Sequence, residues 1–434
     1  MADSSEAYPE RVDAVVIGAG PAGATAATVL ARAGRTVLVL ERRPLPRFHI
    51  GESLLPYNMA LFEQLGMADY IRSQGYVDKY GAEFCGGPLS RYGRLSFSSQ
   101  GPDRHHAVYQ VERARFDHDL ARFAQDSGAR LLEEATVREL LREDGRVVGV
   151  SYEHQGTVRT VRAGQVVDCG GRASKAAQTF GLRKPLPERR MVAVFRHFHG
   201  IREEHNPGHE GDIQIGNHKD GWLWAIPIRR DTLSVGAVMP REVFRTGEPA
   251  ELFEQHLARI QRISARLTGA EPVGDFHIET DYNYYADTLA GDGWIMAGDA
   301  GAFFDPIFSA GAFLAMTTGK AAAEAVLEML DAPERAAAVR EAYSNFYKTG
   351  YDMYARLIHS YYDHTYSLRS FLKSMGMEIQ GAVIDNKWFV RLVSGDFWGD
   401  DNELNQLLRK EARWDTFAPF ERVRECPFYP AAAV

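Results

Sequence analysis

The stretch GAGPAG at residues 18–23 of this 434-residue chain has the G-x-G-x-x-G spacing that can hold a dinucleotide. Gly18 suits a tight turn, Gly20 lets the backbone approach a diphosphate, and Gly23 lets the following helix pack on a strand. The N-terminus of that helix offers N–H groups and partial positive charge to the diphosphate. Glu41, which ends the next expected strand, can accept hydrogen bonds from the ribose hydroxyls.

A second acid and a second helix start lie far along the chain, in GWIMAGDAGAFFDPIFSAGAFLAMTTGK at residues 293–320. Asp299 follows a short apolar strand, and Gly311 begins a helix rich in small residues that we expect to run to about Leu330. A single NAD site does not need such a second pair. We therefore expect FAD, with its adenosine half at Glu41 and its ribityl and ring half at Asp299 and Gly311.

Two of the six tryptophans stand one residue apart in GWLWAIP, residues 221–227. Because alternate side chains of a strand share a face, Trp222, Trp224 and Ile226 would form one bulky apolar wall, with Pro227 close behind. Aromatic side chains commonly fill cores, so the residues alone favour a packing role between a sheet and the dinucleotide domain.

Several charged residues have two interpretations. Lys79 beside Asp78 is, by itself, most simply a surface ion pair. Arg113 and Asp117 stand at the start of an expected helix, where Arg113 either contacts the cofactor or forms an ion pair that stabilises the helix end. A further basic cluster is most simply solvated surface, and comprises Arg42, Arg43 and Arg47.

Composition narrows the class of protein. The chain is 45% hydrophobic and 25% charged, as globular proteins are, and its net charge of −8 without a basic stripe argues against a nucleic-acid partner. We expect no membrane partner, because no apolar run is long enough to span a bilayer. The first ten residues lack the features of a signal peptide, and the three cysteines lack metal-like spacing. These features predict a cytoplasmic protein without a metal site or a disulfide framework.

The elements that would position these residues alternate between strand and helix. An apolar run at 12–17, an alanine-rich helix at 24–33 and a second strand at 36–40 form a βαβ unit. Residues 166–172, VVDCGGR, give a third strand that ends in an acid and two glycines. From about residue 341 the chain is helical, with aromatic residues at helix spacing: Tyr351, Tyr354, Ile358, Tyr361, Tyr362 and Tyr366. This stripe is most simply a packing face; the alternative is that it covers the substrate tunnel or receives a carrier protein.

The dinucleotide elements resemble those of the large FAD-dependent oxidoreductase family related to aromatic hydroxylases, over most of residues 10–340. Four further stretches resemble the phenol and pyrrole branch of the flavin-dependent halogenases. They are HIGESLLP at 49–56, Lys79 in VDKYGAEF, GWLWAIP at 221–227, and DPIFSAG at 305–311.

This resemblance implies an α/β fold: a Rossmann-like FAD-binding domain of the aromatic hydroxylase and glutathione reductase type, an inserted, mostly β substrate domain, and a helical C-terminal region. The expected boundaries are 10–78, 108–183 and 285–340 for the FAD-binding domain, 79–107 and 184–284 for the substrate-domain sheet, and 341–434 for the region that covers the substrate site. The expected cofactor-binding residues are Gly18, Gly20, Ala22, Gly23, Glu41, Arg42, Ser53, Arg113, Asp299, Pro306, Gly311 and Ala312.

The resemblance also implies a reaction. FADH2 and dioxygen form a flavin C4a-hydroperoxide that oxidises chloride or bromide to hypohalous acid, while the tryptophan wall keeps the organic substrate away from the flavin. Lys79 is the implied catalytic residue. It either forms a chloramine, which needs the neutral amine, or hydrogen-bonds hypohalous acid as an ammonium. For the halide we expect the backbone N–H groups of Ser309, Ala310 and Gly311, although this turn can also serve the flavin alone.

Phe308 stands where tryptophan-specific halogenases carry a glutamate, which favours an electron-rich phenol or pyrrole, free or attached to an acyl or peptidyl carrier protein. The absence of a second G-x-G-x-x-G motif for NADPH agrees with FADH2 supplied by a separate flavin reductase. Two other functions use the same fold: FAD-dependent aromatic hydroxylation, and flavin-dependent reduction of isoprenoid lipids. Lys79 and the GWLWAIP segment favour the halogenase.

Overall fold

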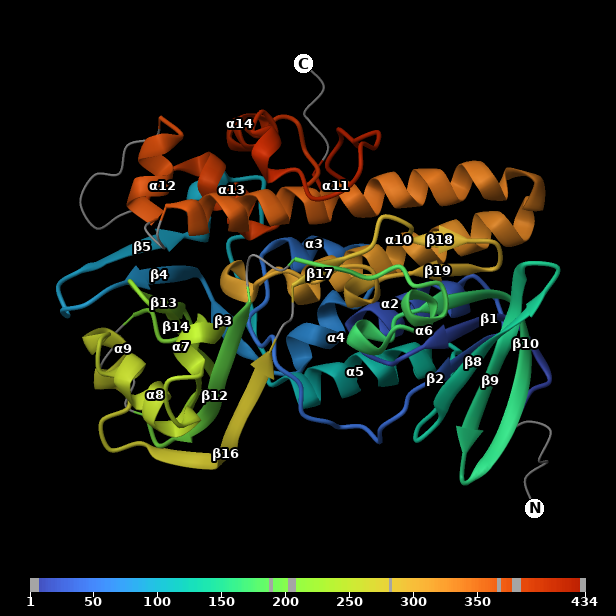
Figure 1. The fold of residues 1–434 in the computed structure, drawn as a ribbon, viewed down its shortest axis with the longest axis horizontal. Coiled ribbons are helices and arrows are strands. Elements are labelled where there is room, and N and C mark those ends of the chain that lie inside the picture. The colour runs from blue at the N-terminus through green and yellow to red at the C-terminus, as the bar shows by residue number, and fades with distance from the viewer. Residues whose placement is uncertain are drawn as a thin grey trace.

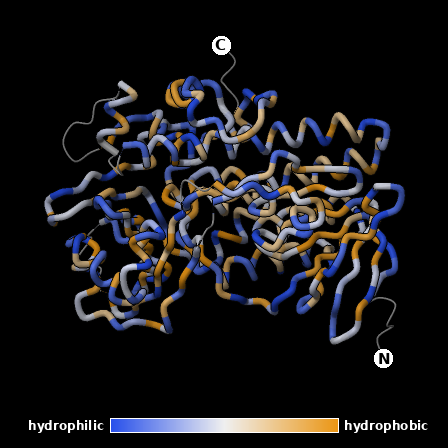
Figure 2. The backbone as a smooth tube through the Cα atoms, viewed as in Figure 1, coloured by the Kyte–Doolittle hydropathy of each residue, from blue (hydrophilic) through white to orange (hydrophobic). Residues whose placement is uncertain are grey.

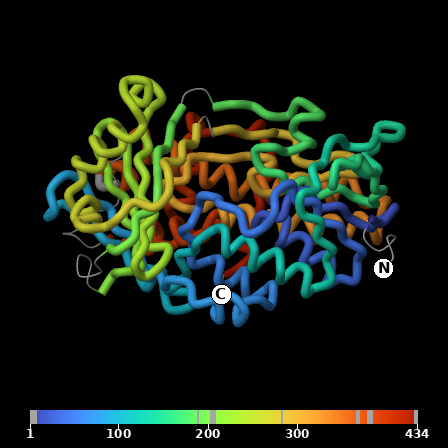
Figure 3. Tube along the Cα trace, turned by 90° about the horizontal axis from the view of Figure 1, so that it is seen from below, coloured from blue at the N-terminus to red at the C-terminus, as the bar shows by residue number. Residues whose placement is uncertain are grey.

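In the computed structural model, residues 8–186, 190–201, 208–280, 283–364, 368–376 and 384–429 are described. Two large sheets lie at opposite ends of the molecule, and one long helix, α11 (Ala336–Asp363), runs along both of them (Figure 1). Viewed from below, the green and yellow strands of the second sheet gather at one end, and the strands near the N-terminus lie at the other (Figure 3).

The first sheet carries the dinucleotide elements. Its strand order is β18 (Ala290–Gly291), β19 (Trp294–Met296), β10 (Thr157–Asp168), β1 (Arg11–Ile17), β2 (Val37–Leu40) and β7 (Arg130–Leu132). Strands β19, β10, β1, β2 and β7 are parallel, and β8 (Thr136–Glu143) and β9 (Arg146–His154) extend β10 as an antiparallel hairpin. Strands β1 and β2 are buried along most of their length and are mainly apolar, as buried parallel strands are (Figure 2).

Three helices pack on this sheet: α2 (Pro21–Arg32), α5 (Arg113–Asp126) and α10 (Gly311–Asp331). Helix α2 begins at Pro21, three residues before the expected start at Ala24, because proline has the φ of a first helical turn and lacks only an N–H that the helix does not use. A Cβ added at Gly319 of α10 would lie 2.4 Å from the Ala22 carbonyl oxygen, so glycine there allows α10 to pack directly on the first turn of α2.

The second sheet has the order β16 (Glu271–Thr280), β12 (Met191–His199), β15 (Thr232–Pro240), β14 (Gly221–Arg229), β13 (Ile213–His218), β4 (Gly81–Cys85) and β5 (Tyr92–Ser96). It is antiparallel except for the β13–β4 pair. Three helices cover one face: α7 (Arg241–Phe244), α8 (Pro249–Leu257) and α9 (Gln261–Arg266). Leu223 and Ala225 of β14 belong to the separate small core between that face and these helices. The other face turns toward the first sheet.

Smaller elements connect the two sheets. They are two antiparallel pairs, β3 (Val77–Lys79) with β6 (Val108–Gln110) and β11 (Lys184–Pro185) with β17 (Tyr284–Tyr285), and three helices, α3 (Tyr57–Gln64), α4 (Ala68–Ser73) and α6 (Lys175–Thr179). The C-terminal region continues from α11 into α12 (Leu368–Ser374), α13 (Lys387–Ser394) and α14 (Glu403–Arg409). The boundary expected at residues 340 and 341 lies inside α11, so one continuous helix joins the flavin-type domain to the C-terminal region. Among the described residues, no helix has the length and apolar character needed to cross a membrane.

Candidate active site

The glycine loop between β1 and α2 has the geometry that the spacing predicts. Gly18 has a φ of +91°, and a Cβ there would lie 2.7 Å from the Cys169 carbonyl oxygen. A Cβ at Gly23 would lie 1.9 Å from the Gly18 carbonyl oxygen, so this position tolerates no side chain. Gly20 is less crowded, because the nearest atom to a Cβ added there would be a nitrogen of the Arg47 guanidinium at 3.7 Å. The space beside Gly20 is therefore open to a ligand.

An ion-pair network continues from this loop. Glu41 accepts hydrogen bonds from the N–H groups of Ala19 at 2.8 Å and Arg43 at 3.1 Å, and Arg47 lies 3.5 Å from its carboxylate. Arg47 also lies 3.5 Å from Asp117, which is fully buried and binds Arg113 through both carboxylate oxygens. Of the two roles considered for Arg113, the structure shows the ion pair at the start of the helix. Arg113 also donates a hydrogen bond to the Ile50 carbonyl oxygen at 2.6 Å.

The second half of the expected cofactor site surrounds Asp299. This half-buried carboxyl makes no hydrogen bond or ion pair with any residue that the structure describes. Desolvation raises the pKa of Asp299 to about 7, against the opposing effect of Arg113 and Arg172. Gly311, the first residue of α10, has no atom within 4 Å of where its Cβ would be, and its N–H has no acceptor within the helix.

The residues expected to bind halide are not equivalent. Ser309 has the left-handed φ of 58°, and its N–H donates to the Pro306 carbonyl oxygen at 2.8 Å. Burial raises the pKa of Tyr354 well above its usual value, and the neighbouring N–H groups of Phe308 and Ala310 oppose that shift. Because the Ser309 N–H is already engaged, the Gly311 N–H, which has no acceptor within α10, is the better placed of these two donors for an added anion.

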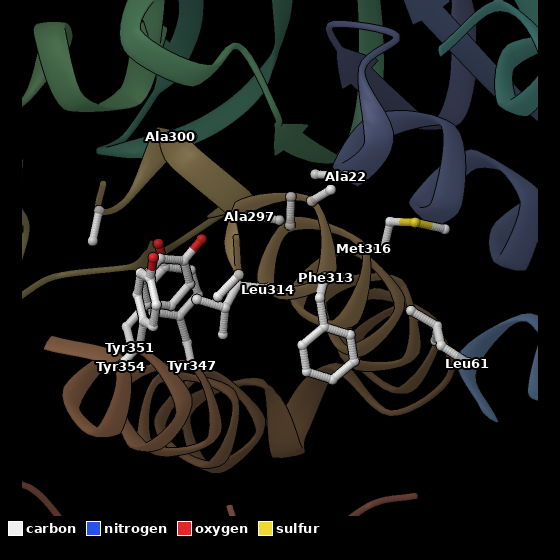
Figure 4. Close-up of a cluster of buried hydrophobic side chains, with 14 of the residues drawn as sticks. Ala22, Leu61, Ala297, Ala300, Phe313, Leu314, Met316, Tyr347, Tyr351 and Tyr354 are labelled. Atoms are coloured by element: carbon white, nitrogen blue, oxygen red, sulfur yellow. The ribbon is translucent and has the colours of Figure 1, made fainter. Parts of the chain in front are cut away.

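Tyrosines of α11 hold the loop that carries Asp299. Tyr347 donates to the Gly298 carbonyl oxygen and Tyr354 to that of Asp305, both at 2.7 Å, and Tyr343 donates to that of Met296 at 2.5 Å. Their hydroxyls point toward the segment with Ala297 and Ala300 (Figure 4). The stripe is a buried packing face, as its simplest interpretation predicts, although Tyr366 lies outside the described residues.

Trp222, Trp224 and Ile226 lie on the face of β14 that turns toward the first sheet, and all three belong to the main core. The two indole rings are 5.9 Å apart and tilted by 48°. Trp224 Nε1 donates to Ser234 Oγ at 3.2 Å, whereas Trp222 Nε1 donates to the Tyr362 hydroxyl at 3.1 Å. That hydroxyl donates to an Asp305 carboxylate oxygen at 2.6 Å, so hydrogen bonds connect the wall with the loop before α10. Pro227, the next residue, is also buried.

Lys79 is only 2% exposed, which contradicts the simple interpretation of a surface ion pair. Its Nζ donates to Ser53 Oγ at 2.9 Å and to the Leu54 carbonyl oxygen at 2.8 Å, and lies 5.3 Å from the centre of the Phe97 ring. Desolvation lowers the pKa of Lys79 to about 7, although Asp212 opposes the shift. This pKa gives a large neutral fraction at ordinary pH. The structure brings Lys79 and Ser53 together from segments far apart in the sequence.

Comparison with known proteins decides the family. Residues 11–340 match the model of a family described as FAD binding domain. The chain is 32% identical to a 1H-pyrrole-2-carbonyl-[peptidyl-carrier protein] brominase of Pseudoalteromonas luteoviolacea, over 74% of this chain and 78% of that one. It is 31% identical to a tryptophan 2-halogenase of Chondromyces crocatus, over 82% and 68%. The chain belongs to the flavin-dependent halogenases.

Solved structures of flavin-dependent halogenases have the same fold as this chain. The flavin-dependent brominase Bmp2 superposes on the halogenase with a TM-score of 0.81 at 26% identity, covering 92% of this chain and 98% of that one. The myxobacterial chondrochloren halogenase CndH gives 0.77 at 30% identity, covering 94% and 95%. The predicted Rossmann-like FAD-binding fold is therefore confirmed, as is the predicted family.

The residues of the halogenase fit FAD. Gly20 leaves open space at the N-terminus of α2, and Asp299 presents a carboxyl that no described residue binds. Gly311 leaves a second open space at the start of α10. Bound FAD would bring a redox-active ring that, once reduced, reacts with dioxygen. Glu41, Asp299 and the two helix starts would hold the cofactor along its length.

Some residues at this site were assigned wrongly or missed from the sequence. Arg47, expected to be solvated surface, is instead paired with two buried acids. Arg42 is exposed and makes no hydrogen bond or ion pair within the described part of the chain, and its contact with the cofactor stays a prediction. No sequence pattern predicted a role for Gln110, a buried residue of β6, because a glutamine in a short strand carries no recognisable motif. The positions of Arg47 and Gln110 depend on contacts between distant segments, which spacing does not encode.

Proposed function

We propose that this halogenase attaches chlorine or bromine to an electron-rich phenol or pyrrole and that the neutral amine of Lys79 transfers the halogen. The observation that carries the proposal is the burial of Lys79, whose pKa falls to about 7. A neutral amine supplies two N–H groups, and Lys79 Nζ has two acceptors, Ser53 Oγ and the Leu54 carbonyl oxygen. Its lone pair then remains available to an electrophile.

The transfer has two balanced steps. Dioxygen is the oxidant for hypohalous acid, which would form from halide and a proton as FADH2 is oxidised to FAD and one water is released. Hypohalous acid then gives its halogen to the Lys79 nitrogen as an N–H hydrogen leaves, and a second water is released. The N–halogen bond then breaks as the aromatic ring bonds the halogen, and the proton lost from the ring restores the amine. The surroundings favour this route because Asp212, whose charge opposes the shift of Lys79, is already engaged by Arg94 and by the Tyr80 N–H.

The Trp222–Trp224 pair would separate the flavin from the aromatic substrate, so that the halide meets the oxidant first. The two indoles form a continuous buried surface, and close packing leaves no room for a substrate to pass between them. We place the halide at the start of α10, with the Gly311 N–H as its principal donor.

The substrate class rests on Phe308. This side chain is buried and packs edge-on against the rings of Tyr361 and Phe389 at 5.3 and 6.4 Å, where a carboxylate would be desolvated. Although one relative is named a tryptophan 2-halogenase, Phe308 supplies no charge to an indole. The relative named as a brominase of a carrier-bound pyrrole supports a substrate on a peptidyl carrier protein. We further propose a separate flavin reductase as the source of FADH2.

The test supplies FADH2, dioxygen and chloride or bromide with a panel of phenols and pyrroles, and reads the products by mass spectrometry. A halogen isotope pattern supports the proposal, whereas a gain of one oxygen supports the hydroxylase. Lys79→Ala should keep FAD binding and hydrogen peroxide release and lose halogenated product. If the Lys79→Ala variant halogenates at the parental rate, the proposal that the Lys79 amine transfers the halogen is wrong.

A further inference from the structure

The fully buried side chain of Gln110 on β6 has one unused hydrogen-bonding group. Its Nε2 donates to the Gly211 carbonyl oxygen at 2.9 Å, and its Oε1 has no hydrogen-bond partner among the described residues. Only the amide nitrogen can donate to a carbonyl, so this bond fixes which end of the amide points away from Gly211. A buried acceptor without a donor is destabilising, and native structures retain few of them.

Strand pairing puts this acceptor on the face that carries Lys79. Ser53 opposes Gln110 in an antiparallel bridge, flanked by the bonds Leu54 N–H to Tyr109 O and Val111 N–H to Glu52 O. Side chains of such a non-hydrogen-bonded pair lie close together on one face of a sheet. Gln110 also opposes Val77 of β3, and Lys79 stands two residues further along β3, on the same face.

The hydrogen bond from Lys79 Nζ to Ser53 Oγ confirms that these side chains share a face. Strand β14, which carries Trp222 and Trp224, lies next to both β3 and β6. The amine, the hydroxyl and the unused amide oxygen thus belong to one face of neighbouring strands that adjoin β14.

We propose that Gln110 Oε1 accepts a hydrogen bond from the phenolic O–H or pyrrole N–H of the substrate, and so selects substrates that carry such a donor next to the ring. This inference rests on the proposed function and names a second substrate-binding residue for it. The bond satisfies the buried acceptor and turns the ring relative to Lys79. It also raises the electron density of the ring, because the donor group becomes more negative as its proton is shared.

The experiment compares matched pairs of substrates that differ only in the donor: resorcinol with its dimethyl ether, and pyrrole-2-carboxamide with its N-methyl derivative. For each pair, the kcat/KM of the parental enzyme should be at least tenfold higher for the substrate that carries the O–H or N–H donor than for its methylated partner. Gln110→Met keeps the length of the side chain and removes the acceptor. It should lose about tenfold on the donor substrates and less than about twofold on the methylated ones.

Binding is measured separately, by quenching of tryptophan fluorescence with the same compounds and without FADH2. Gln110→Met should weaken binding of the donor compounds about tenfold. Gln110→Glu should retain the preference, since a buried, protonated carboxyl can donate to Gly211 and accept with its other oxygen. The matched control is Gln165→Met on β10, which removes another buried glutamine whose Oε1 lacks a partner in the described structure, and should leave the preference unchanged.

The inference is overturned if the parental enzyme treats the members of each pair alike, or if Gln110→Met reduces activity on both equally, as a purely structural role predicts. Should Gln110→Met fail to fold, the parental preference and the Gln110→Glu result decide alone. Failure of the proposed function gives a different result: the parental enzyme then halogenates no compound of the panel, while the binding titrations still report on Gln110.

Discussion

Replacing Lys79 by methionine should make the stability of the protein less dependent on pH in a defined window. Burial lowers the pKa of Lys79 from 10.5 to about 7 in the folded chain. Between these two values the unfolded state binds a proton that the folded state does not, so raising the pH stabilises the parental fold. Below pH 7 the amine is protonated in both states, and the full cost of burying the charge is present.

The magnitude follows from the shift. Well above the folded pKa each pH unit relieves about 1.36 kcal/mol, so from pH 6 to pH 9 the parental protein should gain about 2.7 kcal/mol from Lys79 alone. Lys79→Met has no such gain. Its stability relative to the parental protein should therefore fall by about 2.7 kcal/mol between pH 6 and pH 9, because titration of all other groups cancels in the difference.

Urea unfolding of both proteins without FAD, at pH 6, 7, 8 and 9, measures this difference. The matched control is Lys184→Met, which removes an exposed lysine whose pKa the hydrogen bond to Asp287 raises, so that its difference should stay constant over this range. A constant difference for Lys79→Met as well, within about 0.5 kcal/mol, would refute the reasoning. The amine would then keep its proton at neutral pH, and the neutral-amine route would fail with it.

Three further predictions concern the surroundings of the site. Gly236→Ala would bring a Cβ to 2.2 Å from the Trp224 ring, so it should lower the free energy of unfolding by about 1–3 kcal/mol in urea titrations and raise the ratio of hydrogen peroxide to halogenated product. Tyr347→Phe removes the hydrogen bond to the loop before Asp299, so it should lower the free energy of unfolding by about 1 kcal/mol and weaken FAD binding measured by flavin fluorescence. Tyr351→Phe removes a hydroxyl without a partner among the described residues. It should lower the free energy of unfolding by less than about 0.5 kcal/mol and leave FAD affinity unchanged. Glu41→Gln should weaken FAD binding about tenfold or more in the same assay, and unchanged affinity would contradict the role of Glu41 at the ribose.

The dinucleotide part of the fold could be predicted from the sequence because its determinants are local. The glycine spacing, the apolar strands and the small residues of α10 each constrain their own neighbourhood, and the structure has β1, α2 and β2 within three residues of their predicted limits. Alternation along GWLWAIP likewise predicted which side chains of β14 share a face, since the period of a strand is fixed.

The environment of Lys79 could not be predicted in this way. β3 is only three residues long, and the acceptors for Nζ come from residues 53 and 54, which pair with β6 rather than with β3. The same holds for Arg47, whose partners Glu41 and Asp117 stand on different elements. Burial of a charge is a property of the assembled sheets, and a pattern of residue types describes only one segment at a time.

The two interpretations of the tryptophans are compatible, and the hydrogen bonds show why. Trp222 is a core residue by burial, and its indole N–H is linked through the Tyr362 hydroxyl to Asp305, six residues before Gly311. Because the same chain of hydrogen bonds orients the turn that leads into α10, a change that tilts Trp222 should also disturb the proposed halide site. The separation of flavin from substrate proposed for the tryptophans and the proposed halide site are therefore expected to fail together.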